Sequence, residues 1–424
     1  MTQTQTSGDR TTGGADPLDP VGGARAWVVW GVAVIGYFMA MVQRNGMGVA
    51  ALEAQARFDV GPALLSLLPM LQLLIYVLLQ VPAGLLADRL GPRYTLVIGM
   101  VAMAGGSALF ALAPGIGAAV AGRFLIGLGD ALVFLNVIRL AALWFPRSRY
   151  ALISGLTGVV GGVGQVASAA PLAWALDGVG WVAAFLATTG LSLLVSVLVL
   201  LVVRDRPAGA AGHSTAVDPL SLWAALKEAL ASRGTRIGMA HHSAVMAPFT
   251  MMMVLWGYPF LVTGLGLAGD TAALTLTVLA AGALWVAPVV GALIGRNPGL
   301  RGVFALSLAT VIGLGLVLLV AWPGGVPTAV GLVVLGVCAA GQTMAPTLSF
   351  DYARDDIPAS RTGVSSGLVN MSGFTTAVVC TVAAGAILQA VPEGPDAFRL
   401  AFLPICAMTL LSGAVLALLV LRRR

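Results

Sequence analysis

Charged side chains are scarce in this chain of 424 residues. Only 9% of the residues are Asp, Glu, Lys or Arg, whereas charges make up about a quarter of an ordinary soluble domain. So little charge cannot cover a surface that faces water. Because 58% of the residues are hydrophobic and the mean hydropathy is +0.96, the composition excludes a soluble globular protein and indicates one that lies in a membrane.

Cysteine is also rare, and no phosphate-binding loop is present. Cys338, Cys380 and Cys406 stand singly in separate apolar runs, which implies neither a disulfide framework nor a metal site. The sequence has no Gly-x-x-x-x-Gly-Lys segment, so we expect no ATP-driven step. It also has no cluster of nucleophile, base and metal ligands that would mark a catalytic centre. We therefore expect neither an enzyme nor a cofactor.

What the chain does have is a series of apolar runs, each long enough to cross a bilayer, which takes about 20 residues. We expect helices because hydrocarbon offers no partner for free peptide groups, and a barrel would alternate polar and apolar residues. The predicted fold class is an all-α polytopic membrane protein with twelve transmembrane helices. The predicted spans are 27–52, 62–87, 94–113, 117–143, 150–176, 181–203, 237–262, 271–294, 303–321, 328–350, 364–390 and 397–421.

The basic residues predict how these spans are oriented. Cytoplasmic loops hold an excess of Lys and Arg, and most of the 23 basic residues fall on one side if the N-terminus is inside. We therefore expect a protein of the plasma (inner) membrane with both termini in the cytoplasm. The net charge of +6 reflects this rule. Because the charges are spread over many loops and form no clustered patch, we expect no nucleic-acid partner.

An internal duplication divides the chain. The segment that joins spans four and five recurs, at one constant offset, in the segment that joins spans ten and eleven: Pro146, Arg149 and Gly155 correspond to Pro358, Arg361 and Gly367. A fixed period of this kind marks repeated structural units. We predict two pseudo-symmetric six-helix bundles, 25–203 and 237–424, joined by a cytoplasmic linker, 204–236. Residues 1–24 are predicted to be a disordered cytoplasmic tail.

Two motifs resemble signatures of the major facilitator superfamily. Residues 84–93 read Gly-Leu-Leu-Ala-Asp-Arg-Leu-Gly-Pro-Arg, which is similar to the family's loop between its second and third helices. The matching positions are Gly84, Asp88, Arg89, Gly91 and Arg93. Residues 123–129 read Arg-Phe-Leu-Ile-Gly-Leu-Gly, which resembles the family's Arg-x-x-x-Gly-x-Gly segment in span four.

This resemblance, which covers almost the whole chain, implies a transporter whose two halves rock about a central site in alternating access. It also implies that the loop residues of 84–93 act as a conformational gate. In that role Asp88 contacts the start of span eleven, near Thr362, while the cavity faces outward. A helix N-terminus attracts anions, which gives this contact its physical basis. The alternative is that Asp88 and Arg89 only fix the topology.

Four ionisable residues lie within the predicted spans of the first half: Arg44, Arg123, Asp130 and Arg139. Such residues cost at least about 2.5 to 3.5 kcal/mol each, so they face a cavity or a partner. Arg123 and Asp130 project from nearly the same face of span four, where they can act as one site. A conformational change that alters their separation would load and release a proton, which makes Asp130 the candidate for proton coupling.

Arg44 in span one is the candidate anion clamp, because a guanidinium offers paired donors to a carboxylate. Tyr37 lies on a similar face of the same span. The alternative is that Arg44 reaches the outer headgroups or pairs with Asp130.

Further substrate-binding candidates are polar or aromatic residues in other spans: Tyr76, Gln165, Gln342, Asn370 and Trp256. Each amide is also explained as a helix-to-helix hydrogen bond, and Trp256 is also explained by ordinary packing.

These observations favour a secondary active transporter of a small, anionic organic solute, coupled to protons. Its other expected partner is membrane lipid, and we expect a monomer. One alternative is a proton-driven exporter of drugs or metabolites with the same fold, for which Asp130 and the aromatic residues are the support. A more remote alternative is a membrane enzyme or receptor that transports nothing, against which the short loops argue.

The gate hypothesis makes a prediction. Asp88→Asn should leave membrane insertion intact but reduce transport, because the amide lacks the charge that a helix N-terminus attracts. Uptake into membrane vesicles measures the effect, with the amount of inserted protein determined by immunoblotting. Unchanged uptake at equal insertion would contradict the gate.

Overall fold

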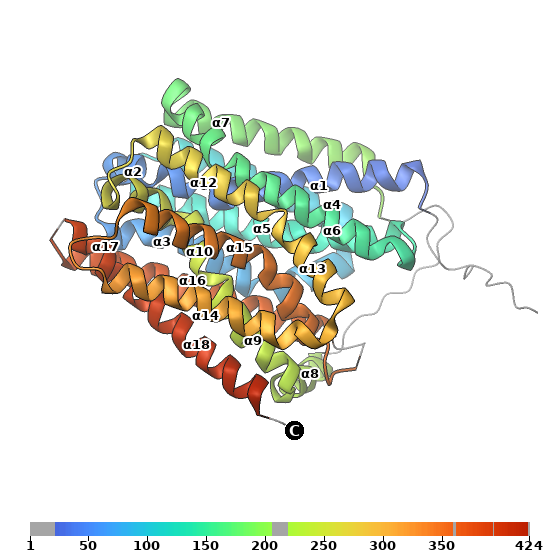
Figure 1. The fold of residues 1–424 in the computed structure, drawn as a ribbon. Helices are drawn as coiled ribbons and strands as arrows, with labels where there is room; N and C mark the ends of the chain where they lie inside the picture. The colour runs from blue at the N-terminus through green and yellow to red at the C-terminus, as the bar shows by residue number, and fades with distance from the viewer. Residues whose placement is uncertain (1–21, 206–218, 359–361, 393, 423–424) are drawn as a thin grey trace, which may run out of the picture.

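The computed structural model describes residues 22–205, 219–358, 362–392 and 394–422. The described elements are helices, most of which run side by side along one direction (Figure 1). In the first half of the chain they are α1 (Ala24–Asn45), α2 (Met47–Phe58), α3 (Pro62–Leu78), α4 (Gln80–Ala111), α5 (Ile116–Trp144), α6 (Arg147–Ala167) and α7 (Ala170–Val202).

The helix α8 (Pro219–Ala231) follows within the predicted linker. The rest of the chain forms α9 (Arg233–Val245), α10 (Ala247–Met251), η1 (Met252–Trp256), α11 (Gly257–Pro259), η2 (Phe260–Gly264), α12 (Gly269–Ala283), α13 (Val286–Arg296), η3 (Pro298–Leu300), α14 (Arg301–Ala321), α15 (Thr328–Tyr352), α16 (Thr362–Ala390), α17 (Pro395–Ala401) and α18 (Leu403–Leu421).

Each predicted span is mostly helical, but several spans are broken. In the described residues, eight helices are long and apolar enough to cross a membrane, or nine if a pair bent by 42° within 233–264 is counted as one. Residues 152–202 enter that count once, although Gly180 divides them with a φ of 78°. The predicted spans two and eight are each divided between two helices, α3 with α4 and α12 with α13. These breaks reconcile the count with the twelve predicted spans, and the all-α polytopic fold is confirmed.

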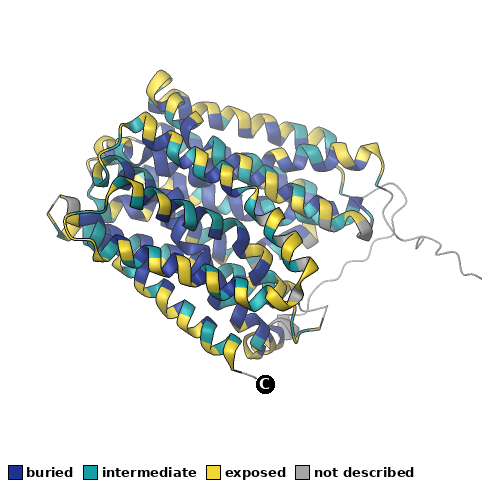
Figure 2. Ribbon diagram, viewed as in Figure 1, coloured by how far each residue is buried: buried dark blue, intermediate teal, exposed yellow. Residues whose placement is uncertain are grey.

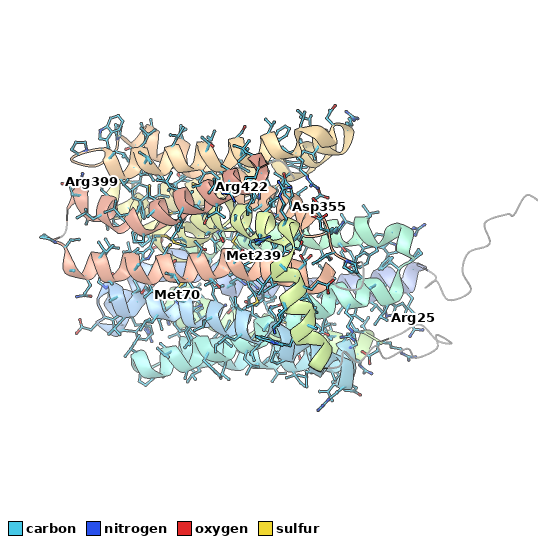
Figure 3. The ribbon with its side chains drawn as sticks, turned by 90° about the horizontal axis from the view of Figure 1, so that it is seen from below. Arg25, Met70, Met239, Asp355, Arg399 and Arg422 are labelled. Carbon is cyan, nitrogen blue, oxygen red and sulfur yellow. The ribbon has the colours of Figure 1, made fainter. Side chains whose placement is uncertain are left out.

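The outer surface of the bundle is apolar, as a lipid-facing surface must be. Buried residues line the inward sides of the helices and exposed residues the outward sides (Figure 2). Many of the exposed side chains are large and hydrophobic, such as Leu201, Val278 and Leu421. Figure 3 shows Arg25 and Arg399 at opposite ends of the bundle, which are the ends predicted to face the cytoplasm and the outside.

Glycines bring spans three and four into backbone contact. A Cβ placed on Gly106 of α4 would lie 2.6 Å from the carbonyl oxygen of Gly122 on α5 and 2.8 Å from the amide nitrogen of Ile126. Gly99 and Gly129 face each other in the same way farther along the two helices. Close approach through small residues is a common means of helix association in membranes. It fixes α5, the helix that carries Arg123 and Asp130.

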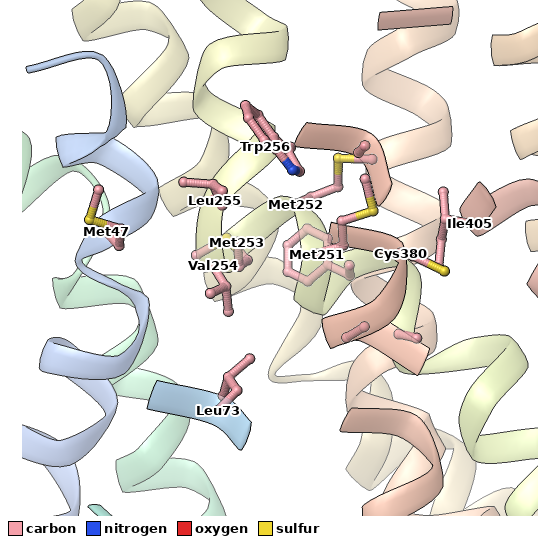
Figure 4. Close-up of a cluster of buried hydrophobic side chains, with 14 of the residues drawn as sticks. Met47, Leu73, Met251, Met252, Met253, Val254, Leu255, Trp256, Cys380 and Ile405 are labelled. Atoms are coloured by element: carbon pink, nitrogen blue, oxygen red, sulfur yellow. The ribbon is translucent and has the colours of Figure 1, made fainter. Parts of the chain in front are cut away.

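The two halves meet mainly at their predicted outer ends. Among the described residues, extensive packing between the halves joins α3 to α16, α2 to η1 and α11, and α12 to α6 and α7. At one contact, a Cβ on Gly385 of α16 would lie 2.8 Å from the carbonyl oxygen of Pro62. At another, Gly48 lies directly against the carbonyl of Met253. Figure 4 shows the apolar cluster beside it, where Met47 and Leu73 face the run from Met251 to Trp256.

Two neighbouring glycines provide a test of the span three to span four contact. Gly106→Ala should destabilise the protein by about 1 to 3 kcal/mol, the usual cost of overpacking, because its methyl group meets backbone that cannot rotate away. Gly105→Ala is the matched control, because no atom lies within 4 Å of a Cβ there. The melting temperatures of the two purified variants measure the difference. Equal values would contradict the contact.

Candidate functional site

The guanidinium of Arg44 is bound to the carboxylate of Asp130. Nε donates to Oδ2 and Nη2 to Oδ1, both at 2.8 Å. Arg44 is 6% exposed and Asp130 is fully buried, so water does not screen the pair. Two parallel hydrogen bonds between charged groups are among the strongest polar interactions in proteins.

Aromatic rings surround this ion pair at the junction of the two halves. The Arg44 guanidinium carbon lies 4.2 Å from the ring centroid of Tyr76 on α3 and 5.7 Å from that of Phe374 on α16. The centroids of these two rings are 5.5 Å apart. A guanidinium over an aromatic face is attracted by the ring's electrons. The predicted candidates Arg44, Asp130 and Tyr76 therefore lie together, and Phe374 joins them from the other half.

Arg123 bonds to partners other than Asp130, and the hypothesis that the two act as one site stays a prediction. Its Nη1 donates to the backbone oxygen of Gln43 at 3.2 Å and to Oε1 of Gln72 at 3.1 Å, and its Nη2 contacts the sulfur of Met47 at 3.3 Å. Its guanidinium carbon lies 4.0 Å from the centroid of Phe110. All these partners are neutral and belong to the first half. The alternative in which Arg44 pairs with Asp130 is the arrangement that the structure has.

The amides of Gln165 and Gln342 meet across the two halves. Gln165 on α6 donates through Nε2 to Oε1 of Gln342 on α15 at 3.2 Å. Gln342 in turn donates to the hydroxyl of Thr250 at 3.1 Å. These two predicted candidates form a polar bridge, as amides between membrane helices often do.

The remaining predicted binding residues are Tyr37, Trp256 and Asn370. Tyr37 packs against Gly161 of α6, and its ring centroid is 5.0 Å from that of Phe134. Trp256 is buried and donates its Nε1 to the backbone oxygen of Thr381 at 3.0 Å, within the second half. Asn370 is half-buried on α16. The structure thus gives Trp256 a packing role, whereas Tyr37 lies close enough to the ion pair to interact electrostatically with Arg44 and Asp130.

The predicted gate loop turns at Gly91, whose φ of 81° suits glycine. Asp205, which lies just after span six, caps the next helical turn, because the backbone amide of Arg93 donates to its Oδ1 at 2.7 Å. Arg89 is exposed, and the backbone oxygen of Gly84 lies 3.5 Å from Nη1 of Arg139. The side chains of Asp88 and Thr362 lie outside the described residues, so their predicted contact stays a prediction.

Gln43, which precedes Arg44 in the sequence, also belongs to the site, and so do Asp205 and Phe374, which the sequence analysis did not single out. The backbone oxygen of Gln43 accepts a hydrogen bond from Arg123, and its side-chain amide donates to the hydroxyl of Ser192 at 2.7 Å. Its position beside Arg44 was the available signal. Asp205 and Phe374 lie far from their partners in the sequence, and no local pattern points to them. In the described part of the chain, no group of three or more His, Cys, Asp or Glu could hold a metal ion.

Comparisons with known proteins agree with this architecture. Residues 33–381 match the sequence model of the Major Facilitator Superfamily. The solved structure of a bacterial homolog to the human lysosomal transporter Spinster, in an inward-facing and unoccupied conformation, has a TM-score of 0.72 at 15% identity. That similarity covers 94% of this chain and 97% of the other.

Two curated relatives are also similar in sequence. A putative tartrate transporter of Agrobacterium vitis is 26% identical over 178 residues, which cover 40% of this chain and 41% of the relative. The match therefore spans about two fifths of that relative. A probable galactarate/D-glucarate transporter of Escherichia coli (strain K12) is 26% identical over 362 residues, which cover 74% of this chain and 76% of the relative.

The ion pair predicts a specific pattern of stabilities. Arg44→Gln or Asp130→Asn alone should destabilise the protein by about 3 to 5 kcal/mol, because each leaves one buried charge uncompensated. The double variant should be less destabilised than the sum of the two, because it removes both charges. Melting temperatures of the purified variants measure this coupling. Arg123→Gln combined with Asp130→Asn is the control and should be additive; coupling there, and none for Arg44, would reverse the assignment.

Proposed function

The chain belongs to the major facilitator superfamily, and from this membership we propose that it carries a small organic anion across the membrane together with a proton. It is a multi-pass membrane transporter and not an enzyme. The observation that carries the proposal is the buried bidentate pair of Arg44 and Asp130 at the junction of the halves. Arg44 is the anion-binding residue, and Asp130 is the residue that takes the proton.

A substrate carboxylate and the carboxylate of Asp130 compete for the same donors. Asp130 occupies Nε and Nη2 of Arg44, which is the geometry that any carboxylate would use. When Asp130 is protonated, its hold on the guanidinium weakens and the donors become available. Binding of the proton therefore favours binding of the anion, and the two ligands bind together.

The balance of buried charge explains why the two would also move together. Without ligands, the side-chain charges of Arg44 and Asp130 sum to zero. With a proton on Asp130 and an anion of one negative charge on Arg44, the sum is again zero, and a dicarboxylate meets this condition when its second carboxylate is protonated. A carrier with only one of the two ligands holds an uncompensated buried charge, which costs about 3 to 5 kcal/mol and corresponds to at least a hundredfold fewer productive transitions. Only the empty and the fully loaded carrier reorient readily.

The names of two relatives support an anionic substrate. Tartrate, galactarate and D-glucarate, after which they are named, are sugar-acid dicarboxylates. A carboxylate of this type fits the guanidinium of Arg44. The exporter alternative rested in part on the aromatic residues, of which Trp256 donates a hydrogen bond to Thr381 inside the second half.

The packing of the halves supports an inward-facing conformation. The extensive contacts between them lie at the ends predicted to face outward, including the bond from the amide of Ala170 to the hydroxyl of Thr277 at 2.8 Å. In this proposal the protein lies in the plasma membrane as a monomer, with both termini in the cytoplasm and the substrate path open on that side.

Transport by the purified protein in liposomes tests the proposal. Wild-type protein should accumulate tartrate, galactarate or D-glucarate when the outside is more acidic, and a protonophore should abolish the accumulation. Arg44→Gln should lose both accumulation and exchange of labelled for unlabelled substrate, because the anion has no paired donors.

Asp130→Asn should separate the two activities. The amide cannot take up and release a proton, so accumulation driven by a pH gradient should be lost while exchange remains. Asp177→Asn is the matched control, because Asp177 is exposed, and it should transport as the wild type does. Asp130→Asn protein that still accumulates substrate against its gradient would refute proton coupling through this residue.

A further inference from the structure

The helix α8 presents an unpartnered amphipathic stripe on the surface. Its inward side consists of Ala225 and Ala229, which are buried where the helix packs on α9 and α16. Trp223, Lys227 and Leu230 lie on one outward side, since residues four and three apart share a helix face. Trp223 is 64% and Leu230 46% exposed, and the ammonium of Lys227 lies 5.6 Å from the Trp223 ring centroid.

We propose that this stripe docks on the headgroup region of the cytoplasmic membrane leaflet and favours anionic phospholipid. Trp223 and Leu230 would enter the boundary between headgroups and acyl chains, and Lys227 would contact lipid phosphate. An amphipathic helix with aromatic and aliphatic side chains beside a lysine has the composition of helices that lie in this boundary. The inference goes beyond the transport proposed above and does not depend on which solute is carried.

The depth of α8 supports this docking. Arg233 lies two residues after α8. It donates to the backbone oxygen of Leu419 through Nη2 at 2.6 Å and through Nε at 3.1 Å, and its Nη2 also donates to the backbone oxygen of Arg422 at 2.6 Å. These acceptors lie at the end of α18, where the exposed apolar residues Leu418 and Leu421 give way to arginine. The change marks the level at which hydrocarbon ends. The helix α8 therefore ends at the boundary between hydrocarbon and headgroups.

The direction of α8 and the distribution of its charges also support this docking. The yellow-green helix α8 crosses the direction of the spanning helices (Figure 3), as a helix in the plane of the membrane does. Ala224, Glu228 and Ala231 form its other exposed side, so the acidic residue lies on the side away from the lysine stripe. Arg233 and Arg236 follow in the sequence. Basic residues near an anionic leaflet are attracted to it.

Labelled cysteines provide the test. The three native cysteines are buried, so an exposed new cysteine can be labelled selectively with an environment-sensitive fluorophore. The full-length protein with Leu230→Cys, in vesicles with phospholipids that carry a quencher high on the acyl chain, should show a blue-shifted emission and strong quenching. Ala224→Cys is the matched control on the other exposed side and should show little of either. Equal quenching at the two positions, or none at either, would overturn the docking.

A second arm tests the preference for anionic lipid. Quenching at Leu230→Cys should be stronger in vesicles that contain phosphatidylglycerol than in pure phosphatidylcholine, and adding Lys227→Gln should reduce the difference. Free inorganic phosphate should not compete. Quenching that is independent of phosphatidylglycerol, or a difference that Lys227→Gln leaves undiminished, would overturn the lipid preference. Because neither arm measures transport, a failure here is distinguishable from a failure of the proposed anion carrier.

Discussion

The buried ion pair of Arg44 and Asp130 is the interaction around which the site is organised. In hydrocarbon neither group can keep its charge without a partner, so α1 and α5 must hold their facing positions as long as both groups are ionised. Glycine contacts between α4 and α5 fix one of these helices, and the rings of Tyr76 and Phe374 cover the guanidinium. The position of the site at the junction of the halves follows from this pairing.

The buried charges of Arg44 and Arg123 are accommodated in different ways. Arg44 is neutralised by a carboxylate, whereas the contacts of Arg123 are a backbone carbonyl, an amide oxygen, a sulfur and an aromatic ring. Neutral acceptors satisfy hydrogen bonds but leave the charge in place. Arg123 thus keeps a positive potential beside Gln43, the neighbour of Arg44 in the chain. In the proposed mechanism, that potential favours an anion at the site when Asp130 is protonated and Arg44 is free.

The sequence predicted the helices, the family and the identity of the buried charges, because long apolar runs and rare ionisable residues are local signals. It left open which charges would pair. The spacing of Arg123 and Asp130 places both on one helix face, but seven residues along a helix span about 10 Å, and Arg44 approaches Asp130 from a different helix. The contact of Asp205 with Arg93 and the position of Phe374 beside Arg44 likewise depend on tertiary packing. The helix α8 was missed because its short pattern lies within a polar segment.

The chemistry of the contact between the halves differs from that of the site. In the part of the chain that the structure describes, the ion pairs join residues of the same half: Arg44 with Asp130, Arg301 with Asp351 and Asp355, and Arg399 with Asp396. Across the halves there are neutral bonds, such as Gln165 to Gln342 and Ala170 to Thr277, and glycine contacts. A neutral hydrogen bond contributes about 0.5 to 1.5 kcal/mol, against about 3 to 5 kcal/mol for breaking a buried ion pair. Among the described residues the contact between the halves is therefore held by the weaker interactions, and in the proposed transport cycle it is this contact that opens.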